Sequence, residues 1–192
     1  MNDSVVAVLE DMFSDEDPLK VAKAAEAVIG YCHAQQLQAF HQVFVESELG
    51  ADPDGLVVDP TPPEVACAMV WSPGAASLMV DVAVDVVSGL PVLLTALAQG
   101  RIDLSKAREI ATATLGLERG ARRALVERAI DYAATRTRHQ VRGWLPRQVD
   151  RIDPDAAERR RKKARTCRKV SLIPEPDGMA TLSAYLTAEE AT

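Results

Sequence analysis

Apolar residues recur at helical spacing through the first part of the chain. They follow Asp17 and Pro18, a helix cap and a proline at the first helical position, and return every three or four residues. This pattern predicts one long helix, or two helices joined at Gly30. We therefore expect residues 1–50 to form an N-terminal helical segment.

The periodicity stops at residues 51–63, where the sequence reads ADPDGLVVDPTPP. Gly, Pro and Asp concentrate in this segment, and such clusters between periodic segments are typical of loops. The segment is therefore predicted to be a linker between the N-terminal helical segment and a helical core over residues 64–152.

Ser72 and Pro73 mark a sharp turn near the start of the predicted core. A short helix precedes them, Ser72 caps the next helix, and Pro73 occupies its first turn. The outline is that of a helix-turn-helix, but the second helix carries Asp81 and Asp85 and offers no Arg, Lys, Asn or Gln to base edges. This composition favours an αα-hairpin packed in the core over a helix that reads a DNA groove.

Two-faced helices are predicted through the rest of the core, over residues 101–152. In the first of them, capped by Asp103, apolar residues form one stripe while Arg108 and Glu109 lie on the polar face. In the last, apolar residues stay in register and arginines point elsewhere, with Pro146 kinking or dividing the helix. Helices of this kind pack inward on one side.

The last segment, residues 153–192, is predicted to hold a basic helix and then a β-hairpin. Five consecutive cations, residues 159–163, must surround the helix axis because a turn takes 3.6 residues, so this helix should project from the body. Alternating apolar residues around Pro176–Gly178 predict the hairpin. The capping-box pattern at Thr187 starts a helix that does not follow, which predicts a truncated product.

The composition fits this fold class, a mainly α multi-helix bundle with a basic projecting helix and a C-terminal β-hairpin. Hydrophobic residues make up 47% of the chain but aromatic residues only 4%, and small apolar side chains suit closely packed helices. The three cysteines form no Cys-x-x-Cys pair, which favours a reducing compartment without a disulfide framework. The chain starts without a basic signal-peptide region and shows no uninterrupted apolar span, so we expect a cytoplasmic protein that does not contact a membrane.

Basic residues are concentrated in one part of the chain. Twenty of the 22 Lys and Arg residues lie between Arg101 and Lys169, whereas residues 1–100 hold 15 acidic and two basic residues. A polyanion that meets the basic part experiences its local field rather than the net charge of -6. Duplex DNA is therefore a candidate partner, bound through its phosphates without sequence preference. The candidate contacts are Arg138, Arg142, Arg147, Arg151, Arg159, Arg160, Arg161, Lys162, Lys163 and Arg165.

The same charge pattern has a second interpretation. The cations could serve solubility, or pair with the acidic first half within one chain or between subunits, which would make the chain a protein-interaction or self-association module. If nucleic acid is bound, the scarcity of aromatic residues in the basic part, with only Tyr132 and Trp144, disfavours stacking on single strands. A homo-oligomer is therefore the alternative to a DNA complex.

Two further groups of side chains carry weaker signals. His33 and His41 are eight residues apart, whereas a metal-binding pair on a helix needs a spacing of three or four. Asp81 and Asp85 share a helix face and could bind Mg²⁺, but without a third ligand an exposed acidic face is the favoured interpretation. We therefore predict no metal site, no cofactor and no catalytic residue.

Three stretches of the chain resemble a known family. They read LPVLLTALAQGRIDLSKAREIA, DPDAAERRRKKAR and RKVSLIPEPDGMATLSAYLTAEEA, in that order. The resemblance is to the domain of unknown function 222, or 13E12 repeat family, of actinobacteria and their phages. It implies a helical domain that usually precedes an HNH endonuclease domain, and hence a DNA-processing context.

The chain departs from the HNH part of that family pattern. Its one asparagine is Asn2 and its last histidine is His139, so the catalytic roles of an HNH domain have no residues to receive them. The resemblance therefore implies a non-catalytic helical module of an HNH endonuclease-like protein, or a truncated gene product without retained activity.

Overall fold

The computed structural model is mainly α-helical and ends in a β-hairpin, as the sequence pattern predicts. It divides into two compact units, Met1–Pro146 and Arg147–Thr192, and each is described by itself. The described residues are 10, 13, 14, 17–47, 50, 51, 57–155, 158, 162, 165–174, 176–187, 189 and 190.

The first unit begins with a long helix, α2 (Pro18–Glu46), which runs unbroken through Gly30. The Asp17 carboxylate accepts a hydrogen bond from the Leu19 amide at 2.9 Å and so caps the helix as predicted. The alternative of two helices joined at Gly30 is therefore wrong. The buried residues of α2 recur every three or four positions, so that one stripe faces the core.

The segment after α2 holds a short antiparallel pair of strands and two helices joined by a sharp turn. At that turn the Ser72 hydroxyl accepts a hydrogen bond from the Ala75 amide at 3.3 Å, which is the predicted cap. Regular structure begins inside the segment predicted to be a linker. The elements are β1 (Gly50–Ala51), β2 (Val57–Val58), α3 (Thr61–Met69) and α4 (Pro73–Val84).

Helix α4 continues directly into one turn of π-helix, η1 (Asp85–Gly89), before the chain turns into α5 (Pro91–Ala98). The end of α5 has the left-handed residue that commonly closes a helix, because Gly100 adopts a φ of 67°. Its amide donates to the Leu97 carbonyl at 2.9 Å. Gly100 thus terminates α5 as the sequence predicts.

Three two-faced helices complete the described part of the first unit and cross into the second. They are α6 (Leu104–Thr114), α7 (Arg119–Ala133) and α8 (Arg138–Ile152). Pro146 lies inside α8, and the helix is not divided there. The boundary between the two units falls within this helix, at Pro146 and Arg147.

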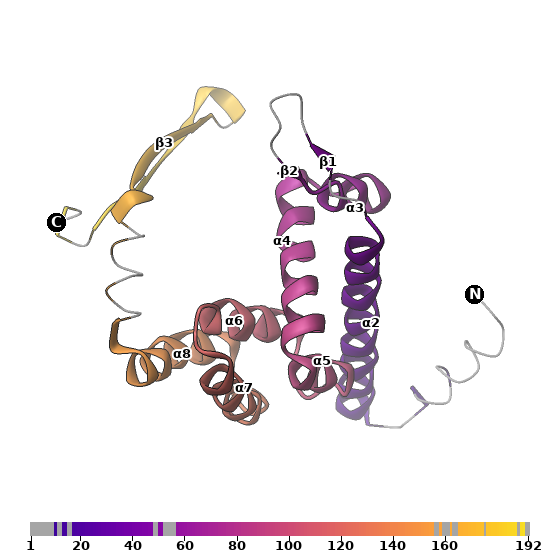
Figure 1. The fold of residues 1–192 in the computed structure, drawn as a ribbon. Coiled ribbons are helices and arrows are strands. Elements are labelled where there is room, and N and C mark those ends of the chain that lie inside the picture. The colour runs from indigo at the N-terminus through magenta and orange to yellow at the C-terminus, as the bar shows by residue number, and fades with distance from the viewer. Residues whose placement is uncertain are drawn as a thin grey trace. The chain divides into compact units, whose positions relative to one another are not determined.

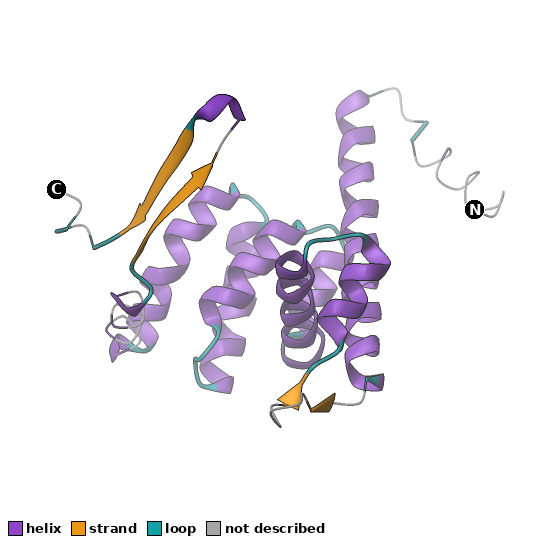
Figure 2. Cartoon of the chain, turned by 90° about the horizontal axis from the view of Figure 1, so that it is seen from above, coloured by secondary structure: helices purple, strands orange, loops and turns teal. Residues whose placement is uncertain are grey.

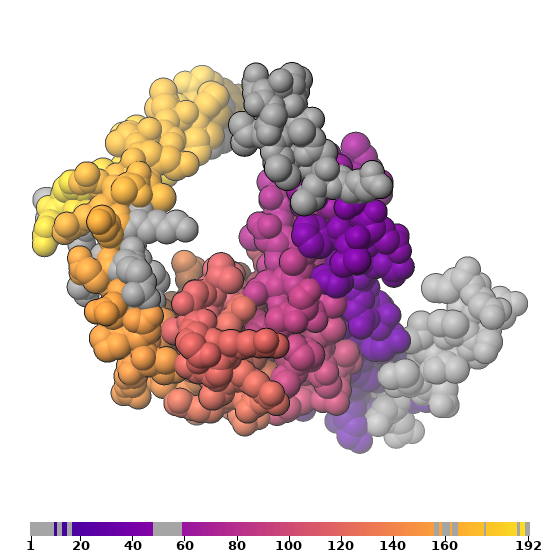
Figure 3. All heavy atoms as spheres, viewed as in Figure 1, coloured from indigo at the N-terminus to yellow at the C-terminus, as the bar shows by residue number. Residues whose placement is uncertain are grey.

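The core of the first unit lies between α2, α4 and α5, with α6 and α7 packed against α5. Figure 1 shows α4 beside α2, and Figure 3 shows their side chains in continuous contact on the face in view. Asp81 and Asp85 leave the opposite side of α4 free to bury valines, so α3 and α4 form an αα-hairpin in the core as expected. Its largest fully buried side chains include Leu37, Leu93, Leu97, Ile110 and Leu125.

Two glycines allow α2 and α5 to approach closely. A Cβ atom on Gly30 would lie 2.6 Å from the Leu97 carbonyl oxygen, and one on Gly100 would lie 2.7 Å from the Ala27 Cα. Neither carbonyl nor backbone Cα can move aside as the end of a flexible side chain can. The contact between these helices therefore requires glycine at both positions.

Gly30→Ala is expected to lower the free energy of unfolding by about 2 kcal/mol, because the added methyl group forces the helices apart. Chemical denaturation of the full chain measures this. Gly74→Ala is the matched control, since nothing lies within 4 Å of a Cβ atom on this glycine of α4. The control should be neutral or slightly stabilising. An equal effect of the two changes would contradict the close approach.

The second unit contains the end of α8, the basic segment and the β-hairpin, which Figure 2 shows as paired orange arrows. The hairpin is formed by β3 (Lys169–Pro174) and β4 (Ala180–Tyr185), joined through η2 (Pro176–Gly178). Gly178 adopts a φ of 73°, which explains why the turn needs glycine. The predicted hairpin is therefore confirmed.

The two faces of the hairpin differ in polarity. Val170, Leu172 and Pro174 lie opposite Ala184, Leu182 and Ala180, and because side chains alternate along a strand, these six share one apolar face. The other face carries Lys169, Ser171, Thr181 and Ser183 among its residues. All six apolar residues are exposed within the described structure.

Among the described residues, no single helix has both the length and the apolar character needed to cross a membrane. The pair formed by Thr61–Met69 and Pro73–Gly89 has them only jointly, and is bent by 117° at the break.

Candidate nucleic-acid interface

The question for a phosphate-binding surface is which cations remain available. Sixteen of the 20 Lys and Arg residues between Arg101 and Lys169 are described. Eight of these sixteen side chains make no hydrogen bond, ion pair or ring contact within the described structure. They are Arg108, Arg119, Arg142, Arg147, Arg151, Lys162, Arg165 and Lys169.

Five of the predicted contact residues are among these eight. Arg142, Arg147 and Arg151 are exposed on α8, and Lys162 and Arg165 are exposed beyond it. Arg147 and Arg151 are four residues apart and therefore share one face of the helix. These side chains keep their full set of donors for an incoming acceptor.

Arg138 is placed differently from the prediction. Its Nε and Nη2 atoms both donate to one carboxylate oxygen of Glu109, at 3.0 and 2.6 Å. The Arg138 side chain is still 59% exposed, whereas Glu109 is only 20% exposed. The first predicted contact on α8 is thus engaged within the molecule, with Nη1 left over.

The remaining predicted contacts, Arg159, Arg160, Arg161 and Lys163, lie outside the described residues. The described residues around them, Glu158 and Lys162, are helical and exposed. The projecting basic helix therefore stays a prediction from the sequence.

The two aromatic rings of the basic part are used within the fold. Tyr132 and Trp144 stack on one another with ring centroids 4.5 Å apart and an interplanar angle of 12°. The Arg136 guanidinium lies over the Tyr132 ring, 5.7 Å from its centroid. This arrangement supports the argument that the module does not bind single strands by stacking bases on aromatic rings.

An ion pair that the sequence analysis missed joins Asp85 to Arg122. Two hydrogen bonds connect them, from Nη1 to Oδ1 at 2.8 Å and from Nη2 to Oδ2 at 2.6 Å. The side chains are only 23% and 14% exposed. The interpretation of an exposed acidic face is therefore wrong for Asp85, although Asp81 is exposed. The 37 positions between the partners leave no local signal in the sequence.

A second acid, Glu118, caps α7. Its carboxylate accepts hydrogen bonds from the Gly120 and Ala121 amides at 2.9 and 3.1 Å. These backbone donors, with Gly120 contributing most, hold the pKa of Glu118 below its usual value. Glu118 is thus ionised and occupied by the helix start, so it leaves the nearby unpaired Arg119 without competition.

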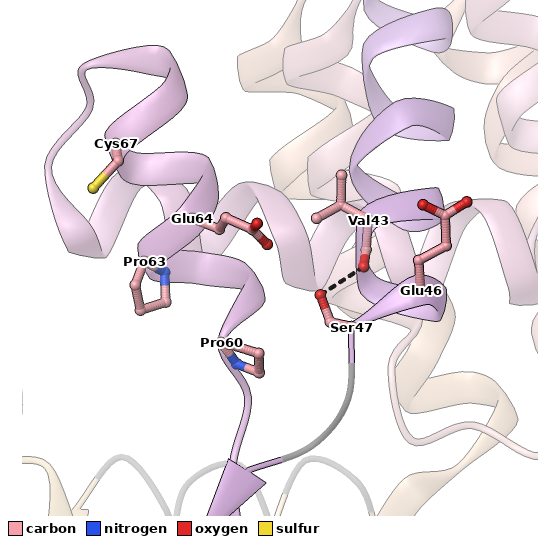
Figure 4. Close-up of a pocket in the computed structure, with 7 residues that line it drawn as sticks. All are labelled: Val43, Glu46, Ser47, Pro60, Pro63, Glu64 and Cys67. Carbon is pink, nitrogen blue, oxygen red and sulfur yellow. Dashed lines mark hydrogen bonds between the residues drawn. The ribbon is translucent and has the colours of Figure 1, made fainter.

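A separate hollow of about 730 Å³ lies between the end of α2 and α3 (Figure 4). Glu46 and Glu64 line it together with Cys67, and the Ser47 hydroxyl there donates to the Val43 carbonyl at 2.7 Å. The Glu46 carboxylate is turned away from Glu64 and accepts a hydrogen bond from Gln42. The hollow is acidic and therefore unsuited to phosphate.

The histidines are not arranged as metal ligands. The Nε2 atom of His41 lies 2.7 Å from the Ser88 hydroxyl, at hydrogen-bond distance. Within the described ranges, no group of three or more His, Cys, Asp or Glu side chains could hold a metal ion.

A sequence model of one protein family, described as Domain of unknown function (DUF222), matches residues 24–192. No curated protein and no solved structure matches the chain.

Proposed function

This chain belongs to the DUF222 family, whose function is unknown, and from that premise we propose that it is a non-catalytic helical module that binds the backbone of duplex DNA. The observation that carries the proposal is the set of unpaired cations. Eight described Lys and Arg side chains of the basic part have no acceptor in the described structure. Like charges held together repel one another, and a polyanion relieves that repulsion while it releases its own counterions.

The proposed binding is independent of base sequence. Arginine and lysine that contact phosphates fix a protein on DNA without reading it, whereas reading needs side chains presented to base edges. The helix that follows the sharp turn, α4, is largely buried and carries no such side chain. The interface therefore consists of charge without a recognition element.

We propose that the module holds DNA for a cleaving activity that it does not itself contain. The support is the resemblance to a family whose helical domain accompanies an HNH domain, together with the absence of the HNH residues from this sequence. The chain has one asparagine, Asn2, and no histidine after His139.

The test is the binding of a fluorescent duplex of arbitrary sequence to the full chain, measured by anisotropy between 50 and 200 mM salt. The variant R147Q/R151Q/K162Q/R165Q removes four unpaired cations. Each phosphate contact adds roughly 0.9 to the slope of log affinity against log salt, so this variant should lower the slope by about 3 to 4. Circular dichroism verifies that the variants are folded.

The matched control is R101Q/R123Q/R136Q/R168Q, which removes four cations that already have partners. Arg101 pairs with Asp131, Arg123 with Glu127 and Arg168 with Glu190, and Arg136 lies over Tyr132. This control should change the slope much less. Absence of salt-dependent binding by the native chain would refute the proposal, and equal slopes for the two variants would refute the assignment of the contacts.

Self-association is the second candidate, favoured by the 15 acidic and two basic residues of the first hundred. It requires oligomers without DNA at low salt, because opposite charges on two copies would attract. Sedimentation of the same samples without DNA decides this, and a monomer at 50 mM salt removes the candidate.

A further inference from the structure

A small polar hollow lies on the first unit, where α6 meets the start of α8. Its volume is about 200 Å³, several times the roughly 30 Å³ that a water molecule occupies in the liquid. It is lined by Ser105, Arg108, Glu109, Thr112 and Arg138. We call it the Arg108 pocket.

The helical repeat of α6 brings four of these residues together. Ser105, Arg108, Glu109 and Thr112 stand at positions i, i+3, i+4 and i+7, which lie on one face of an α-helix. The opposite face, including Ile110, is buried in the core. The pocket is therefore built on a helix whose position is fixed by packing.

Arg138 reaches the pocket from α8 and is held there by Glu109. Both hydrogen bonds to Glu109 use Nε and Nη2 of the guanidinium, so the third nitrogen, Nη1, makes no hydrogen bond in the described structure. A carboxylate that orients an arginine lowers the cost of ordering that side chain when a ligand binds. Glu109 therefore acts on Arg138 as a positioning residue.

Arg108 is the unexplained group of the pocket. Its residue is half-buried, yet no hydrogen bond or ion pair to it exists within the described residues. Glu26 and Asp103 line an adjoining cavity with Arg108, but neither forms an ion pair with it. Asp103 instead accepts the Lys106 amide at 2.9 Å and lies 3.4 Å from the Lys106 Nζ.

A partly desolvated guanidinium without a counter-charge is unfavourable unless a ligand provides one. With Arg108, Arg138 and Glu109, the pocket has two positive charges and one negative charge. The hydroxyls of Ser105 and Thr112 are exposed and add two donors on the same helix face. The ligand that this set fits is an anion with several acceptor oxygens.

We propose that the Arg108 pocket binds one phosphate group of the DNA backbone, an inference that rests on the proposed function. Arg108 supplies the principal charge-assisted hydrogen bonds, Nη1 of Arg138 supplies another, and the two hydroxyls complete the shell. Phosphate presents oxygens in more directions than a carboxylate does, and so can use donors from two helices at once.

The test uses the full chain and two probes, the fluorescent duplex and inorganic phosphate. R108Q should lower duplex affinity about tenfold and the salt slope by about one. R119Q is the matched control because Arg119 is exposed and unpaired in the described structure but does not line the pocket, and it should change affinity less than about twofold. R108K, which keeps the charge and loses the fork, should lie between the native chain and R108Q.

Inorganic phosphate is titrated while the amide resonances of α6 are followed by NMR. The native chain should show shifts at Ser105 and Thr112 that R108Q abolishes, and S105A/T112V should weaken them without unfolding the chain. Duplex binding that is equally affected by R108Q and R119Q overturns the pocket and leaves the proposed function standing. Phosphate shifts that depend on Arg108, in a chain that does not bind duplex, support the pocket as a phosphate site and overturn its assignment to DNA.

Discussion

The variant Arg122→Met is expected to lower the free energy of unfolding by about 3 kcal/mol, because it leaves the carboxylate of Asp85 without its partner. Asp85 is mostly buried, with 23% of its side chain exposed, and water replaces the lost guanidinium only in part. The value stands at the low end for a buried pair for this reason.

Arg122 also ties together elements that are distant in sequence. Its Nε donates to the Thr114 hydroxyl and its Nη2 to the Ala111 carbonyl, both at 3.2 Å, while the pair with Asp85 reaches η1. One side chain of α7 thus holds the end of α6 and the π-helical turn. Methionine preserves the length of the apolar stem but replaces none of these hydrogen bonds.

Arg123→Met is the matched control for this prediction. Arg123 is the next residue of α7 and pairs with Glu127, but the two side chains are 76% and 50% exposed. Its loss should cost less than about 0.5 kcal/mol. Urea denaturation of both variants measures the difference, and D85L/R122M should recover most of the loss because no charge is then left unpaired. Equal destabilisation by the two single variants would show that the pair near η1 is not special.

The second large effect is expected from Pro146→Ala, which should stabilise α8 by about 3 kcal/mol. Proline inside a helix has no amide for the carbonyl four residues before it, here that of Arg142, and its ring crowds that carbonyl. Alanine restores the donor and removes the crowding. The change acts at the boundary between the two units, which falls directly after Pro146.

Hydrogen exchange of the α8 amides is the appropriate measurement, because local opening of this helix need not involve unfolding of the whole chain. Protection of residues 142–150 should rise in Pro146→Ala. Gly143→Ala is the control, since a Cβ atom there meets nothing within 4 Å, and it should add about 1 kcal/mol. Lower protection in Pro146→Ala would mean that packing of Val141 and Leu145 depends on a bend at the proline.

Local features of the fold were accessible from the sequence. The caps at Asp17 and Ser72, the closing glycine at residue 100 and the hairpin turn at Gly178 all depend on residues within a few positions of one another. Short-range chemistry of this kind determines where a helix or strand ends. These predictions are accordingly confirmed.

Pairing between distant side chains was not accessible. Arg138 was predicted as a free cation, but its partner Glu109 is 29 positions away and lies on another helix. Asp85 was interpreted as exposed because its partner, Arg122, is 37 positions away. Periodicity placed Arg108 and Glu109 on a polar face, yet only the meeting of α6 with α8 makes that face a pocket. Tertiary structure decides which charges remain available.

The π-helical turn η1 limits how the length of this chain can change. Such a turn holds one residue more than an α-helical turn, and removing a residue from Asp85–Gly89 would rotate whatever follows by about 100°. Leu90 and Leu93, which are buried, would then swing toward water. Single-residue insertions or deletions at this place thus exchange the interior for the surface, whereas one added to a solvent-facing loop leaves the interior intact.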